Sequence, residues 1–177
     1  MSFWVFGYGS LMWRPDFPFE ESQTALLHGW HRAMCILSTH YRGTPGQPGL
    51  VLGLTRGGSC RGVAFRVAAG REAEVTDILH RRELISDVYT PRFAPVRLAD
   101  GRRVSAYIFV ARPGHAQYAG PLDAAARAAL IRQGHGHGGS SRDYLASTLA
   151  KLAEMGLGGG ELARLLRLVD GKDQTRR

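Results

Sequence analysis

The sequence predicts an α+β fold built on a curved or barrel-like mixed sheet. Strand-like segments fill most of residues 4–110, a single helical segment interrupts them, and helical patterns occupy the last third of the chain. Strands that come first and helices that come late do not fit the regular strand–helix alternation of a parallel α/β sheet.

The first half of the chain reads mainly as strand. Trp4–Tyr8 is a short apolar, aromatic run that ends in a loop at Gly9. A loop rich in Pro and Phe follows, and strand-like runs then recur at residues 24–27, 30–37, 50–54 and 61–67. Turn-forming residues at 42–49 and 56–58 separate these runs.

A helix is predicted over residues 71–84, because apolar residues recur at helical spacing and neither Gly nor Pro interrupts them. Residues 89–98 and 104–110 then flank Asp100-Gly101, a dipeptide typical of a hairpin turn. The sheet is therefore expected to resume after the helix.

The last third of the chain is predicted to form three helices, at residues 123–133, 141–155 and 161–169. Ser140 and Ser141, with Asp143 in the first turn, favour a helix start at the second of these.

The length of 177 residues fits one domain, which we predict over residues 1–170, followed by a basic tail at 171–177 that we expect to be disordered. A hydrophobic fraction of 44% and a charged fraction of 21% are typical of a globular protein, and no apolar run is long enough for a membrane helix. The N-terminal residues lack the features of a signal peptide, so we expect a cytoplasmic protein. Cys35 and Cys60 lie in apolar segments and are expected to be reduced core residues.

The net charge of +8 is spread along the chain in ones and twos, and only Lys151 and Lys172 are lysines. A nucleic-acid-binding surface usually has a basic stripe with interleaved aromatic residues, which is missing. The sequence therefore predicts no nucleic-acid or membrane partner, although a basic surface suits a small anionic substrate.

The loop after the first strand is the first candidate site. Gly7 and Gly9 allow a tight turn, and the following amides of Ser10 and Leu11 can bind a carboxylate or an oxyanion. Alone, this pattern is also typical of a glycine turn that binds nothing. Ser10 is not expected to be a hydrolase nucleophile, because glycine does not flank it on both sides.

Glu83 is the second candidate. It follows Leu79 by four residues and Val75 by eight, which places its carboxylate on the apolar stripe of the predicted helix. Burial there should raise its pKa toward the range of a proton shuttle, unless an arginine at 81, 82 or 92 pairs with it. The alternative is a glutamate at a frayed helix end.

Other reactive side chains are weaker candidates. His135 and His137 lie in a glycine-rich loop, but no Cys or His pair at matching spacing completes a zinc site, so no metal is predicted. Cys35 lies among apolar strand residues and is expected to belong to the core rather than to act as a nucleophile.

Four ordered blocks together resemble the ChaC-like γ-glutamylcyclotransferases: residues 6–15, residues 41–49, Arg82–Ile85 with Tyr89, and residues 139–145. The resemblance covers roughly residues 3–155. It implies a small mixed β-barrel with surrounding helices. Two positions depart from the family pattern: Ser141 stands where asparagine is common, and Tyr41 where histidine is common.

The resemblance also implies a reaction and a set of site residues. Tyr8, Gly9, Ser10 and Leu11 would hold the γ-glutamyl group, and Glu83 would be the acid/base. The other matching blocks carry further expected substrate contacts, at Arg42, Tyr89 and Tyr144.

The implied chemistry is a lyase-type reaction without a cofactor. The substrate's α-amine attacks its own γ-carbonyl, closes 5-oxoproline and expels the attached amine. The resemblance makes glutathione the expected small-molecule substrate. Other γ-glutamyl peptides or amines, or a non-catalytic basic binding module, are the alternatives, and the oligomeric state stays open.

Overall fold

The computed structural model describes residues 2–172, which form two compact units. The first consists of residues 2–32 and 53–116, and the second of residues 33–52 and 117–172. That residues 1–170 form a single domain remains a prediction. Residues 173–177 of the expected tail lie outside the described residues.

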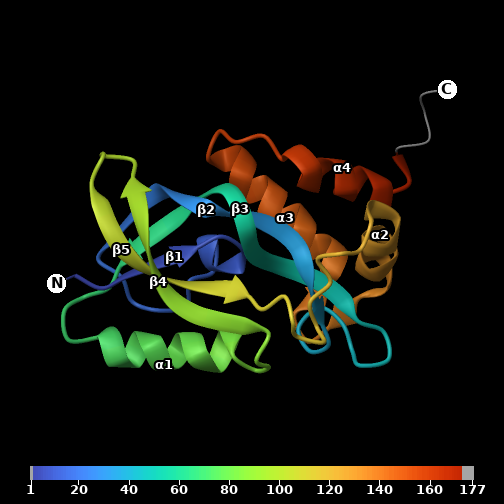
Figure 1. The fold of residues 1–177 in the computed structure, drawn as a ribbon, viewed down its shortest axis with the longest axis horizontal. Coiled ribbons are helices and arrows are strands. Elements are labelled where there is room, and N and C mark those ends of the chain that lie inside the picture. Colours follow the sequence, from blue (N-terminus) through green and yellow to red (C-terminus); the bar gives the residue numbers. More distant parts are fainter. Residues whose placement is uncertain (1, 173–177) are drawn as a thin grey trace. The chain divides into compact units, whose positions relative to one another are not determined.

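The first unit is built on a closed five-stranded barrel, coloured from blue to yellow-green in Figure 1. Its strands are β1 (Trp4–Gly7), β2 (Glu21–Ser38), β3 (Gly49–Arg66), β4 (Tyr89–Leu98) and β5 (Arg103–Ala111), in the order β1-β3-β2-β4-β5. β1 pairs antiparallel with β3 and parallel with β5, so the barrel is mixed. This confirms the predicted α+β class and barrel-like sheet. The ends of β2 and β3 at 33–38 and 49–52 belong to the second unit.

The two long strands correct one sequence prediction. The turn expected at residues 56–58 is wrong, because Gly57 and Gly58 lie inside β3. Both have positive φ values, of 100° and 66°, and bend the strand locally instead of ending it. The turn predicted at 42–49 does fall between β2 and β3, and the hairpin at Asp100-Gly101 is confirmed.

The helix of the first unit, α1 (Glu72–Glu83), runs beside β4 and β5 in Figure 1. Its residues Val75 and Leu79 are fully buried. Acidic residues occupy its first turn and basic residues its last, which suits the helix dipole. His80 reaches across to β5, where its Nε2 lies 2.8 Å from the Tyr107 hydroxyl.

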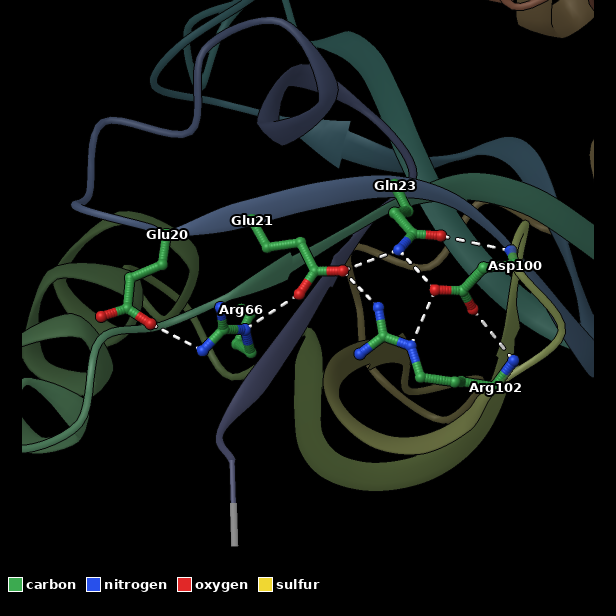
Figure 2. A network of polar contacts seen from close by, with 6 residues as sticks. All are labelled: Glu20, Glu21, Gln23, Arg66, Asp100 and Arg102. Carbon is green, nitrogen blue, oxygen red and sulfur yellow. Dashed lines mark hydrogen bonds and ion pairs between the residues drawn. The ribbon is translucent and has the colours of Figure 1, made fainter.

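A polar network links the beginning of β2, the end of β3 and the β4–β5 turn (Figure 2). Arg66 binds Glu20 and Glu21, at 2.6 Å and 3.0 Å, and Arg102 binds Glu21 and Asp100. Hydrogen bonds from Gln23 and from the Arg102 backbone lower the pKa of Asp100 to about 2.

The second unit contains three helices that pack on one another: α2 (Ala124–Gln133), α3 (Ser141–Glu154) and α4 (Gly160–Val169) (Figure 1). Side chains cap two of them, since Asp123 accepts the Ala126 amide and Ser140 the Asp143 amide. The three predicted helices are confirmed. Two short strands, β6 (His135–Gly136) and β7 (Gly139–Ser140), pair within the glycine-rich loop, where no strand was expected.

Both thiols are buried, as the sequence predicts. Cys35 is fully buried and Cys60 is 3% exposed. Burial raises the pKa of Cys60. No helix among residues 2–172 is long and apolar enough to cross a membrane.

Candidate active site

The loop that follows β1 turns tightly into a short 3₁₀ helix, η1 (Ser10–Met12). The amides of Met12 and Arg14 close it by donating to the carbonyls of Gly9 and Ser10. Within residues 2–172, the backbone N–H groups of Ser10 and Leu11 donate to no protein acceptor. The first N–H groups of a helical turn lack internal partners, so these two are available to a negatively charged oxygen.

Gly7 makes this turn possible. A Cβ atom on Gly7 would lie 2.9 Å from Leu11 Cβ, closer than two such carbons approach. The loop backbone therefore returns over residue 7 only because that residue has no side chain.

Tyr8 anchors the beginning of the loop to the barrel. Its hydroxyl donates to the Phe109 carbonyl of β5 at 2.9 Å, and its own carbonyl accepts from Arg32 Nε of β2 at 2.6 Å. Tyr8 as a whole is only 7% exposed. Its hydroxyl is therefore bonded to main chain, and Tyr8 would serve a substrate mainly by fixing the shape of the loop.

Glu83 is the last residue of α1, and its side chain is 19% exposed. Burial raises the pKa of its carboxyl, and the positive charge of Arg82 opposes this rise. Of the three arginines that the sequence offered as partners, Arg82 forms the pair: its Nε lies 3.4 Å from Glu83 Oε1.

Arg82 also joins Glu83 to the loop. Its Nη2 donates to Ser10 Oγ at 2.8 Å, and its Nη1 donates to the Arg14 carbonyl at 2.6 Å. The structure thus brings together the two candidate features that lie some seventy residues apart in the sequence. Sequence reasoning missed this bridging role, because only the folded barrel places the end of α1 beside the loop.

Two more of the expected substrate residues contact each other in the second unit. Arg42 Cζ lies 5.3 Å from the centre of the Tyr144 ring, a cation–π arrangement, and Arg42 Nη1 donates to the Ser140 carbonyl at 3.3 Å. Tyr144 also accepts the Leu52 amide through its hydroxyl, at 3.4 Å.

Tyr89, the remaining expected contact, is the first residue of β4. It lies opposite Ala111 of β5 and is partly exposed. Its role stays a prediction.

Ser141, one of the two positions at which the sequence was expected to depart from the pattern it resembles, is fully buried. Its hydroxyl donates to the Leu50 carbonyl at 2.6 Å and accepts the Leu50 amide at 3.0 Å. The helix cap is Ser140, whereas Ser141 ties the first turn of α3 to β3.

Comparison with solved structures defines the fold class. A glutathione-specific γ-glutamyl cyclotransferase from yeast matches with a TM-score of 0.87 over 99% of each chain, at 23% sequence identity. The fold is therefore that of a γ-glutamyl cyclotransferase.

Sequence comparison narrows the class to a family. The model of the ChaC-like protein family matches residues 3–172. The chain is 41% identical over 154 residues to a glutathione-specific γ-glutamylcyclotransferase of Escherichia coli. This match covers 87% of the present chain and 67% of the Escherichia coli protein. It is 33% identical over 147 residues to glutathione-specific γ-glutamylcyclotransferase 1 of Homo sapiens, and this match covers 80% of the present chain and 66% of the human protein. The chain thus spans about two thirds of the length of these relatives, and it belongs to the ChaC-like family.

Proposed function

We propose that this protein is a γ-glutamylcyclotransferase specific for glutathione. Membership of the ChaC-like family and the names of the bacterial and human relatives support this proposal. The observation that carries it is the bridge at Arg82, which joins the carboxylate of Glu83 to the hydroxyl of Ser10 in the glycine loop.

The reaction is internal to the substrate. The α-amine forms a bond to the γ-carbonyl carbon, and the bond from that carbon to the cysteine nitrogen breaks. The products are 5-oxoproline and cysteinylglycine, and no water is consumed. Because nucleophile and electrophile belong to one molecule, holding them in attack geometry is worth effective molarities on the order of 10⁵ M or more.

Glu83 serves as the acid/base of this reaction. The α-amine is mostly protonated near neutral pH, so a base must first remove a proton, and the same group then returns it to the departing nitrogen. A raised pKa suits both steps, because it brings the carboxyl closer to the working pH.

The glycine loop supplies the binding part of the proposed site. The Ser10 and Leu11 amides offer two donors to a carboxylate or to the developing oxyanion. Tyr8 and Gly9 shape the loop around them, and Arg42, Tyr89 and Tyr144 remain proposed substrate contacts. The substrate is a small molecule, and buried reduced thiols suit a cytoplasmic location.

Release of 5-oxoproline tests the proposal. Purified protein is incubated with glutathione and, separately, with γ-glutamyl dipeptides and γ-glutamyl amines, and 5-oxoproline is quantified. Turnover of glutathione well above the other compounds is expected. Equal turnover of all of them would contradict the glutathione specificity, and no release from any would contradict the cyclotransferase assignment.

Substitution of Glu83 tests the assigned acid/base. Glu83→Gln keeps the shape of the side chain but cannot exchange a proton, so we expect a loss of about 10²-fold or more in kcat. Glu74→Gln is the matched control, since Glu74 lies on the same helix in an exposed pair with Arg71. Activity of Glu83→Gln similar to that of the control would contradict the assignment.

A further inference from the structure

The Arg82 side chain contacts both parts of the proposed site, the glycine loop and Glu83. Its side chain is 18% exposed, so little water solvates the guanidinium. Nε faces Glu83, Nη2 faces Ser10, and Nη1 faces the loop backbone at Arg14. Nη1 also approaches the Pro15 carbonyl at 3.4 Å and Asp16 Oδ2 at 3.3 Å.

This division of donors depends on the shape of the guanidinium. Its five N–H groups point outward from a rigid plane, so one side chain binds groups on several sides at once. A lysine carries the same charge, but its three donors sit on one nitrogen and cannot span the same partners.

We propose that Arg82 is a positioning residue, which fixes the glycine loop and the acid/base Glu83 in the relative geometry that the reaction requires. This inference rests on the proposed function and deepens it. Arg82 acts on the substrate through Ser10, the loop backbone and Glu83.

The contribution of Arg82 has two separable parts. The hydrogen bonds to Ser10 and Arg14 hold the loop, and the positive charge stabilises the ionised form of Glu83. Two further titratable groups lie close by: Asp16 of the loop pairs with Arg82 itself, and His80, one turn earlier on α1, contacts Tyr107 of β5.

Two variants separate these parts. Arg82→Gln removes the positive charge and the planar set of N–H donors. The pKa of Glu83 should therefore rise further, and the acidic limb of the plot of kcat/KM against pH should move to higher pH. Arg82→Lys keeps the charge, so its acidic limb should stay near that of the wild type. Both variants should lose about 10²-fold in kcat/KM, because the loop is no longer held.

Arg81→Gln is the matched control. Arg81 is the exposed neighbour on the same helical turn, and its side chain makes no hydrogen bond or ion pair among the described residues. Its substitution removes the same charge without touching the loop, so activity and pH profile should match the wild type. An Arg82→Gln profile equal to that of Arg81→Gln would overturn the proposal.

Ser10→Ala tests the hydrogen bond directly. If Arg82 acts through Ser10, the loss in kcat/KM for Ser10→Ala combined with Arg82→Lys should be smaller than the product of the two single losses. Independent, fully multiplicative losses would contradict the contact as a route of action.

A failure of the proposed function would be recognisable separately, because wild-type protein would then release no 5-oxoproline. The role of Arg82 can still be measured in that case. NMR titration of the Glu83 carboxyl and hydrogen exchange at the Met12 and Arg14 amides compare Arg82→Gln with Arg81→Gln. A higher Glu83 pKa and faster exchange in Arg82→Gln support the proposal, and unchanged values overturn it.

Discussion

The Ser141 hydroxyl and the Leu50 main chain form a two-way hydrogen bond, with O···O at 2.6 Å and N···O at 3.0 Å. Both bonds are buried, and they join the first turn of α3 to the beginning of β3. One small hydroxyl thus satisfies a donor and an acceptor of the same residue.

Removing this hydroxyl should destabilise the protein. Ser141→Ala leaves the Leu50 amide and carbonyl without the hydroxyl, at a cost of about 2 kcal/mol in the free energy of unfolding. Denaturant unfolding measures the change. Ser147→Ala, an exposed position on the same helix, is the control and should change little. Equal stability of the two variants would contradict the structural role of Ser141.

Gly7→Ala should impair activity more than stability. The added Cβ would press on Leu11 at 2.9 Å and displace the amides of the glycine loop. A shift of this kind is expected to lower kcat/KM on the order of 10²-fold. Gly114→Ala is the control, because its Cβ would meet no atom within 4 Å. Normal turnover by Gly7→Ala would argue against the loop as the binding element.

Glu83→Gln should unfold at the same temperature as the wild type or higher near neutral pH. Because burial raises the folded-state pKa of Glu83, the wild type loses stability as pH rises from about 4.3, the ordinary value for glutamate, through the folded pKa. The glutamine variant lacks this loss, so the two melting temperatures should converge below about pH 4. A variant that melts well below the wild type at pH 7 would contradict the pKa direction.

Asp100 should have the opposite effect on the pH dependence of stability. Its folded-state pKa of about 2 lies below the ordinary value, so its contribution is present above about pH 3.9 and is lost as pH falls toward 2. The difference in melting temperature between wild type and Asp100→Asn should therefore shrink over that range. Asp77→Asn, an exposed position on α1, is the control. A difference independent of pH would show that Asp100 acts without its charge.

Local patterns in the sequence predicted most elements of the fold. The turn dipeptide Asp100-Gly101 predicted the hairpin that contains β4, and Ala94, Val96 and Leu98 are the buried members of that strand. The boundary within β3 was wrong because Gly57 and Gly58 are typical turn residues, and only pairing within the barrel keeps that strand continuous.

The site divides in the same way. Glu83 and the glycine loop carried local signals: a carboxylate on an apolar helix face, and two glycines after a strand. The bridge through Arg82 had no local signal in the sequence, because an arginine beside a glutamate near a helix end is in most proteins an ordinary exposed pair. Its meaning depends on tertiary contacts with Ser10 and the Arg14 carbonyl, which no spacing along the chain encodes.

The burial of both cysteines bears on how this protein would behave in its redox environment. The proposed substrate carries a thiol, and accessible protein thiolates attack the disulfide of its oxidised form, which leaves a mixed disulfide on the protein and releases one reduced molecule. Cys35 and Cys60 present almost no surface to such a reagent, and the raised pKa of Cys60 keeps it protonated. The catalyst would therefore keep working without mixed-disulfide modification while the ratio of reduced to oxidised glutathione around it changes.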